Sequence, residues 1–136
     1  AYSTAAQEHK HTDLYWYGIH GVETLYALMG PGCKQKSRIF NEDGEVVTGL
    51  WEDGRISTFR GIRKGTHPYG ARIVTDKGIY ISDPINSSLY RSLLVEVVEF
   101  LKGGESPLSI DEMEEVFRFM TAAQESSDQG GAPVKM

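Results

Sequence analysis

The sequence of 136 residues contains a single cysteine and no long apolar run. One cysteine, Cys33, excludes a framework of internal disulfides and leaves the cellular compartment open. No run approaches the roughly 20 apolar residues that a membrane-spanning helix needs, so we expect no membrane partner. The first residues carry no signal-peptide pattern, so a cytoplasmic location is the default expectation; export stays open as an alternative, because the sequence begins with Ala1 rather than Met and a targeting segment could precede it.

The sequence also lacks an excess of basic residues. Fourteen Lys and Arg residues stand against nineteen Asp and Glu residues, which gives a formal net charge of −5. Non-specific binding to nucleic acid or to an anionic membrane needs a basic surface, so we expect no nucleic-acid partner. A small neutral or anionic substrate remains compatible with this composition, because it needs only local positive contacts.

Metal-binding and nucleotide-binding patterns are missing as well. His9 and His11 alternate around Lys10, but no cysteine or acid cluster at ligand spacing accompanies them, so we predict no metal site. A bound dinucleotide needs a glycine-rich turn between a strand and the helix that follows it. The glycines at 30–32 and 130–131 follow helices instead, so we predict no cofactor-binding residues in this chain.

What the sequence does contain is one helix, a run of strands and two further helices. Helical periodicity extends from residue 17 to residue 29 and ends at Gly30. Segments rich in β-branched and aromatic residues follow, separated by glycine turns. We expect strands at 34–40, 46–51, 55–61, 71–75 and 79–82, helices from 89 to 101 and from 110 to the glycines at 130–131, and a short edge strand at 133–135.

This order predicts an α+β fold, with a mostly antiparallel sheet of five to six strands and helices packed on one face. Residues 1–12 are polar and lack hydrophobic periodicity, so we expect an extended or mobile segment before a domain spanning 13–136. In the strand at 55–61, Ser57 and Phe59 share one face and Ile56, Thr58 and Arg60 the other. The second face is only partly polar, which is typical of a surface that another subunit or domain covers.

The two later helices have clear starts and apolar stripes. The helix at 89–101 follows the cap sequence Asn86-Ser87-Ser88, and in the last helix Ser109 and Glu112 form a capping box. The apolar half of the helix at 89–101 consists of Leu89, Leu93, Leu94, Val97, Phe100 and Leu101. We expect the buried stripe of the last helix to consist of Met113, Val116, Phe117 and Met120.

The stretch DLYWYGIHGVETLYALMG, residues 13–30, brings three aromatic residues, glycines and a histidine to the start of the first helix. The apolar residues of this helix share one side, and His20, Glu23 and Thr24 lie on the other. The positive end of the helix dipole disfavours protonated histidine, whereas Glu23 favours it, so His20 is a candidate proton-transfer group. A surface or packing role is the more common one for a lone helical histidine.

The residues Tyr17-Gly18-Ile19-His20, followed by Glu23 and by Leu28-Met29-Gly30, resemble a motif of the Gfo/Idh/MocA family of nicotinamide-dependent oxidoreductases. That family carries Asp-x-Gly-x-His, an acidic residue three positions later and a helix that ends in glycine. Trp16 stands at the position of the family's Asp. The resemblance continues at 51–54, 90–102 and 111–136, so it covers nearly the whole chain.

The resemblance implies a C-terminal substrate-binding and oligomerisation domain of an NAD- or NADP-dependent dehydrogenase acting on a sugar, polyol or related carbohydrate. The cofactor would be bound mainly by a preceding Rossmann domain of the same polypeptide, and identical subunits would associate through the open sheet face. The implied catalytic acid/base is His20. The implied substrate-binding residues are Tyr15, Trp16, Tyr17, Glu23 and Thr24. Because Trp16 cannot orient an imidazole as a carboxylate would, Glu23 is the substitute.

The alternative is a non-catalytic α+β domain that binds a ligand or mediates oligomerisation. In that case Tyr15, Trp16 and His20 would line a ligand pocket or an interface. A glycine-rich strand–turn–helix encoded upstream of Ala1 would decide in favour of the enzyme.

Overall fold

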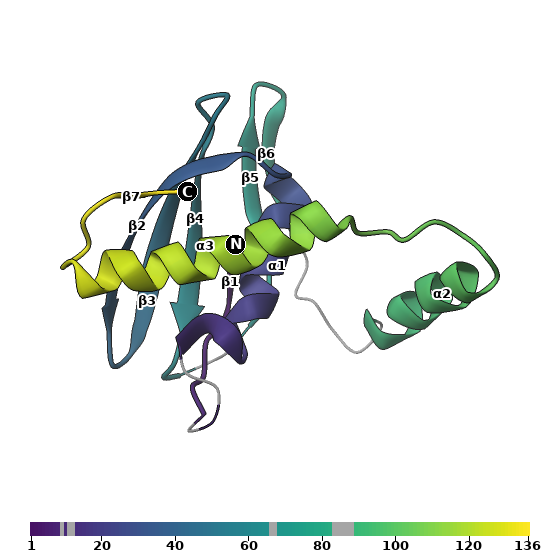
Figure 1. Cartoon of the computed structure of the whole chain (residues 1–136), viewed down its shortest axis with the longest axis horizontal. Coiled ribbons are helices and arrows are strands. Elements are labelled where there is room, and N and C mark those ends of the chain that lie inside the picture. The colour runs from purple at the N-terminus through teal and green to yellow at the C-terminus, as the bar shows by residue number, and fades with distance from the viewer. Residues whose placement is uncertain (9, 11–12, 66–67, 83–88) are drawn as a thin grey trace.

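The computed structural model describes residues 1–8, 10, 13–65, 68–82 and 89–136. These residues form a five-stranded sheet, a separate two-stranded sheet and three α-helices (Figure 1). The elements in chain order are β1 (Tyr2–Thr4), the 3-10 helix η1 (Asp13–Tyr15), α1 (Gly18–Met29), β2 (Cys33–Asn41), β3 (Gly44–Trp51), β4 (Ile56–Ile62), β5 (Arg72–Thr75), β6 (Gly78–Ile81), α2 (Leu89–Leu101), α3 (Ile110–Asp128) and β7 (Val134–Lys135).

The main sheet has the strand order β1-β4-β3-β2-β7. Strands β2, β3 and β4 form an antiparallel meander, and β7 adds to the free edge of β2, also antiparallel. The turn between β3 and β4 contains Gly54, whose φ of 88° suits a residue without a Cβ atom. The predicted α+β class is confirmed, and the sheet is mixed because β1 runs parallel to β4.

The first strand was not predicted, because its polar sequence carries no alternating pattern. Its place depends on contacts far along the chain: the amino group of Ala1 donates to the carbonyl of Thr58 at 2.8 Å, and the amide of Arg60 donates to the carbonyl of Ala1. Strands β5 and β6 were predicted correctly in position. They pair with each other, and an isolated bridge between Tyr2 and Gly70 links them to the main sheet.

Helices α1 and α3 cover one face of the main sheet, and Figure 1 shows α3 crossing it with α1 alongside. The core between these two layers consists of Leu14, Val22, Leu25, Tyr26, Cys33, Val47, Trp51, Phe59, Val116, Phe119, Met120 and Ala123. On β4, Ser57 and Phe59 point into this core, whereas Ile56, Thr58 and Arg60 are exposed, as the alternation predicted.

Helix α1 lies very close to the sheet because of Gly21. A Cβ atom at this position would be 2.2 Å from Cε2 of Phe59 and 2.3 Å from Oγ of Ser3. The contact therefore requires glycine and fixes which side of α1 faces the strands. His20 and Glu23 are on the side that remains exposed.

The capping box of α3 is confirmed: the Ser109 hydroxyl accepts from the amide of Glu112, and the Glu112 carboxylate accepts from the amide of Ser109. The predicted buried stripe is wrong at two positions, since Met113 and Phe117 are about half exposed. The residues that α3 buries against the sheet and α1 are Val116, Phe119, Met120 and Ala123, spaced at i, i+3, i+4 and i+7.

Helix α2 does not pack on the sheet, contrary to the prediction for the helices as a group. None of its residues is buried, and Figure 1 shows it standing apart from the two-layered body. The cap sequence predicted at 86–88 lies outside the described residues. Within the described ranges, no helix has the length and apolar character needed to cross a membrane.

Candidate functional site

The stretch that carries His20 begins at Asp13, which has an unusual backbone conformation. Its φ of 61° is rare for a residue other than glycine, and the residue is only 8% exposed. Arg38, on β2, donates from Nη1 to Oδ2 of Asp13 at 2.7 Å and from Nη2 to Oδ1. This bidentate pair ties the start of η1 to the helix-covered face of the sheet.

The pair belongs to a larger buried group of charges. Nη2 of Arg38 also lies 2.5 Å from Oε2 of Glu45, and Nη2 of Arg63 donates to Oε1 of Glu45 at 2.7 Å. Both guanidinium groups lie over the ring of Phe40. Burial raises the pKa of Glu45, and the two guanidinium groups oppose that shift. Two carboxylates thus balance two arginines beneath η1, with Arg63 lying 3.9 Å from Asp13.

His20 lies in the first turn of α1, with its ring accessible. Its Nδ1 is 3.2 Å from Oε2 of Glu23, and the two side chains are 57% and 51% exposed. The Thr24 hydroxyl donates to the main-chain carbonyl of His20 at 2.8 Å. In the neutral tautomer with its hydrogen on Nδ1, His20 donates a hydrogen bond from Nδ1 to Oε2 of Glu23, and the ring lone pair is on Nε2. The structure therefore brings His20, Glu23 and Thr24 together in one exposed cluster.

The aromatic residues that precede His20 divide into two groups. Tyr15 turns toward α3: its hydroxyl lies 2.7 Å from Oγ1 of Thr121, and its ring stacks on Phe117 with centroids 6.4 Å apart. Trp16 and Tyr17 instead pack edge-to-face on each other at 5.7 Å. All three predicted aromatic residues are 36–42% exposed, so each presents part of its ring at the surface.

Tyr69, just before β5, is a neighbour that sequence reasoning missed. Partial burial raises the pKa of its phenol, and the nearby phenols of Tyr17 and Tyr90 raise it further. The pKa of Tyr69 is thus coupled electrostatically to Tyr17 and to Tyr90, in the first turn of α2. No local signal in the sequence Pro68-Tyr69-Gly70 indicates this, because the coupling arises from the fold.

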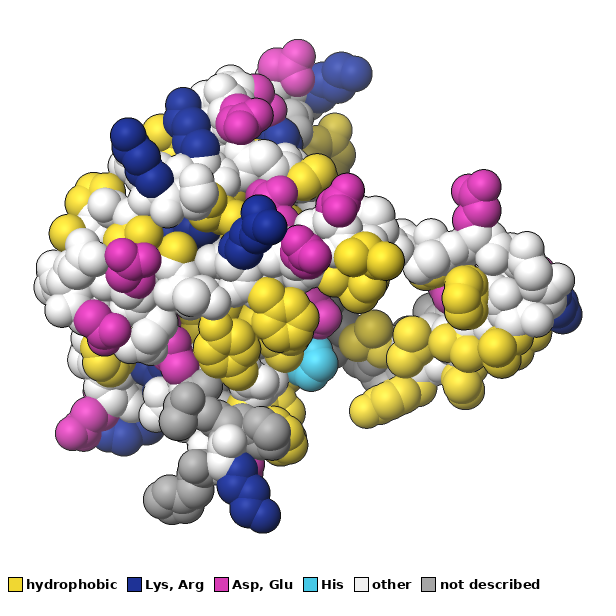
Figure 2. Space-filling view, viewed as in Figure 1, with side chains coloured by type: hydrophobic (Ala, Val, Ile, Leu, Met, Phe, Trp, Pro, Cys, Tyr) yellow, Lys and Arg dark blue, Asp and Glu magenta, His cyan; other side chains and the backbone are white. Residues whose placement is uncertain are grey.

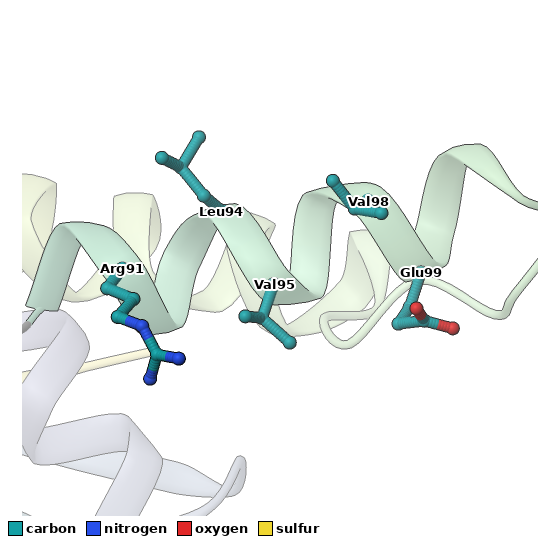
Figure 3. A pocket seen from close by; sticks show the side chains of 5 residues that line it. All are labelled: Arg91, Leu94, Val95, Val98 and Glu99. Atoms are coloured by element: carbon teal, nitrogen blue, oxygen red, sulfur yellow. The ribbon is translucent and has the colours of Figure 1, made fainter.

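A hollow separates the two-layered body from α2, and hydrophobic side chains line both of its sides in Figure 2. A shallow concavity of about 480 Å³ along α2 is lined by Arg91, Leu94, Val95, Val98 and Glu99, as Figure 3 shows. All five residues come from one helix, whose convex surface cannot enclose a ligand. His20 is not among them.

The glycine turns that could cradle a pyrophosphate are already engaged. Glu115, on α3, accepts hydrogen bonds from the amides of Gly32 and Cys33 at 2.8 and 2.9 Å, and also from the Tyr26 hydroxyl. The amides of Gly130 and Gly131 donate to carbonyls of α3. Among the residues that the structure describes, no group of three or more His, Cys, Asp and Glu side chains could hold a metal ion. His9 and His11 lie outside those residues.

Comparison with known proteins identifies the fold. No protein-family model and no curated protein sequence matches the chain, but solved structures do. A putative myo-inositol dehydrogenase from Sinorhizobium meliloti has a TM-score of 0.69 at 11% identity, with 98% of this chain and 54% of that chain covered. A probable dehydrogenase from Thermotoga maritima has a TM-score of 0.66 at 15% identity, with 98% of this chain and 54% of that chain covered. A putative oxidoreductase from Thermotoga maritima has a TM-score of 0.67 at 11% identity, with 99% and 53% covered.

The chain shares the fold of one part of each of these structures. This finding confirms, at the level of the fold, the resemblance to Gfo/Idh/MocA oxidoreductases that residues 17–30 indicated. The chain spans about half the length of each of these structures. The shared fold thus accounts for nearly all of this chain, and for only one part of each matched structure.

Proposed function

We propose that this chain is the C-terminal substrate-binding domain of an NAD- or NADP-dependent dehydrogenase of the Gfo/Idh/MocA type. The proposed substrate is a sugar, a polyol or a related carbohydrate. The observation that carries the proposal is the exposed His20–Glu23 pair in the first turn of α1, within a fold shared with dehydrogenases. In the family motif that residues 17–30 resemble, His20 occupies the position of the proton-transfer group.

The chemistry proposed for this chain is the transfer of one proton. Nε2 of His20 accepts the proton of the reacting hydroxyl as the carbinol carbon becomes a carbonyl, and returns it in the reverse direction. Oε2 of Glu23 lies 3.2 Å from Nδ1 of His20, and this contact orients the ring. A nicotinamide held by the partner domain would supply the acceptor for the hydride that leaves the same carbon.

The residues beside His20 suit a polyhydroxylated ring. The exposed faces of Trp16 and Tyr17 offer apolar surface for the C–H groups of a sugar, and the Tyr17 phenol offers a hydrogen-bond partner for its hydroxyls. Tyr15 has a weaker claim to substrate contact, because its hydroxyl and ring are engaged with Thr121 and Phe117.

We also propose that identical subunits associate through the open face of the main sheet, opposite α1 and α3. Ile39 and Ile56 on that face are 77% and 70% exposed. Their burial against a second copy would remove apolar surface from water without disturbing the helix-covered core.

The experiment that tests the dehydrogenase is an assay of the full-length polypeptide with NAD and NADP against a panel of polyols and sugars. We expect His20→Ala to lower kcat by about 100-fold or more, because general acid–base groups contribute on that scale. Glu23→Gln keeps the shape of the orienting side chain without its charge, so we expect a smaller loss. Thermal unfolding of each variant controls for stability, since both side chains are exposed.

Two results would contradict the proposal. One is near-normal turnover in His20→Ala with the native substrate. The other is saturable binding of NAD or NADP to the 136-residue chain by calorimetry, because its glycine turns at 30–32 and 130–131 are engaged internally. In that case the chain itself would hold the cofactor, and the assignment of its domain would be wrong.

A further inference from the structure

Lys36, on β2, carries a buried amino group for which the described residues supply no hydrogen-bond acceptor. The residue is 1% exposed, and no polar atom of the described chain pairs with its Nζ. A buried cation without a partner is costly, so the interior favours the neutral amine. Burial accordingly lowers the pKa of Lys36 to about 8. A neutral amine has a free lone pair and is therefore a nucleophile.

The thiol of Cys33 lies on the same face of β2 as this amine because of a β-bulge. In a regular strand, residues three positions apart point to opposite faces. Here the register with β3 shifts between Cys33 and Gln35, so that Cys33 is opposite Trp51 and Lys36 is opposite Gly49. The extra residue re-aims the side chain before it. Cys33 and Lys36 are therefore both buried on the helix-covered face.

Gly49 leaves the space in which the two side chains approach each other. It is the cross-strand partner of Lys36, and the Cβ positions of directly opposite residues are about 4.5–5.5 Å apart. A Cβ atom at Gly49 would lie 3.3 Å from Sγ of Cys33. The sulfur atom thus borders the space that a side chain opposite Lys36 would fill. Burial raises the pKa of the Cys33 thiol, and the charge of Lys36 opposes that shift.

Tyr26, on α1, and Glu115, on α3, are the titratable neighbours of this pair among the described residues. Glu115 accepts hydrogen bonds from the Tyr26 hydroxyl at 3.2 Å and from the amide of Cys33 at 2.9 Å. Burial raises the pKa of Tyr26, and Cys33 and Glu115 raise it further, so the phenol keeps its proton. The phenol and the carboxylate thus engage each other, and the Lys36 amine is the nucleophile left beside the thiol.

We propose that Cys33 and Lys36 form a sulfenamide, a direct sulfur–nitrogen bond, when hydrogen peroxide oxidises the protein. The Cys33 sulfur first attacks peroxide, which gives a sulfenic acid and one water molecule; sulfur is oxidised and the peroxide oxygen is reduced. The lone pair of the Lys36 amine then attacks that sulfur. The sulfur–oxygen bond breaks as the sulfur–nitrogen bond forms, and the hydroxide leaves with an amine proton as a second water molecule. The chain loses two hydrogen atoms in total.

The place of Cys33 in the fold gives peroxide a route to the sulfur. Cys33 is the first residue of β2 and follows the turn at 30–32, in which Pro31 is exposed, so a local opening at this end of the strand is sufficient. Because a buried thiol with a raised pKa is a slow nucleophile, the oxidation takes place slowly. The product has no charge on the Lys36 nitrogen, so the bond also removes the cost of the buried ammonium.

The test is peptide mass spectrometry of the full-length polypeptide after treatment with hydrogen peroxide at about pH 8, digested without added thiol. We expect the peptide that contains both residues to be about 2 Da lighter and to resist trypsin after Lys36, and dithiothreitol to reverse both changes. Lys36→Met removes the amine and should abolish the loss of mass. Lys34→Met removes an exposed lysine closer to Cys33 in sequence, and as the matched control it should preserve the loss.

Three results would overturn the inference, which does not depend on the dehydrogenase assignment. A 2 Da loss that persists in Lys36→Met would mean that the sulfur has bonded to a main-chain nitrogen. A loss that disappears in Lys34→Met would assign the bond to the other lysine. A Cys33 that stays unmodified or gains only oxygen, with normal cleavage after Lys36, would mean that the two side chains do not react with each other.

Discussion

Arg38 holds Asp13 through both carboxylate oxygens, although 25 positions separate the two residues in sequence. Arg38 is also tied to α3: its amide donates to Oγ of Ser126 at 2.9 Å and its Nη1 donates to Oε1 of Gln124 at 3.2 Å. One arginine thus connects the start of the His20 stretch, the sheet and the longest helix. The position of η1, and of the aromatic residues after it, depends on a buried ion pair.

Asp13→Ala is expected to lower the free energy of unfolding by about 3–5 kcal/mol, because it leaves the buried Arg38 charge with only part of its compensation. Urea denaturation followed by circular dichroism measures this change. Glu114→Ala is the control, since it removes an exposed ion pair with Arg118 and should cost about 0.5 kcal/mol. Equal losses in the two variants would mean that Asp13 has no special role.

Lys36 is also a buried cation on the helix-covered face, but unlike Arg38 it has no carboxylate bound to its charged group within the described ranges. Its residue is 1% exposed, and among the described residues its Nζ has no hydrogen-bond partner, although it lies 4.7 Å from the centre of the Phe119 ring. Burial lowers the pKa of Lys36 to about 8, and the opposing effects of Cys33 and Glu115 offset only part of that shift. The folded protein therefore bears the cost of a buried ammonium at neutral pH.

This cost predicts that stability rises with pH. Below about pH 8 Lys36 is charged in both states and the folded state bears the full penalty, whereas well above pH 10.5 it is neutral in both. Between these values the unfolded chain binds more protons, so the contribution of Lys36 to the free energy of unfolding should increase by about 3 kcal/mol. Lys36→Met should be more stable than wild type at pH 7 and should lack this increase.

Urea denaturation at several pH values from neutral to alkaline checks this difference. Lys34→Met, which changes an exposed lysine on the same strand, is the matched control and should keep the wild-type dependence. Other groups titrate in the same interval, so the informative quantity is the difference in slope between each variant and wild type. Parallel slopes for wild type and Lys36→Met would refute the prediction.

The proposed self-association through the open sheet face predicts that a charge there favours the monomer. Ile39→Glu and Ile56→Glu place a carboxylate on that face, and a desolvated charge would oppose burial against a second copy. Sedimentation velocity at tens of micromolar should show a shift to smaller species for both variants. Gln129→Glu, just after α3, adds the same charge elsewhere and should leave the distribution unchanged; a strictly monomeric wild type would exclude this interface.

The sequence alone determined the local structure of the chain. The Ser109–Glu112 capping box, the helix end at Gly30 and the alternation of Ser57 and Phe59 with their exposed neighbours all depend on residues close together in sequence. Spacing of this kind also indicated the exposed side of α1, where His20 and Glu23 lie. Such features follow from backbone geometry and from the helical and strand periods, which are the same in every fold.

Only the tertiary structure decided what each face meets. Lys36 and Arg38 carry charges that a strand pattern places at the surface, yet α3 and η1 cover them, and β1 joins the sheet although its sequence has no strand pattern. Conversely, the apolar half of α2 has the pattern of a buried helix and remains exposed in this chain. Periodicity specifies which side chains share a face, but the covering surface comes from segments distant in sequence, or from a partner, and periodicity carries no information about these.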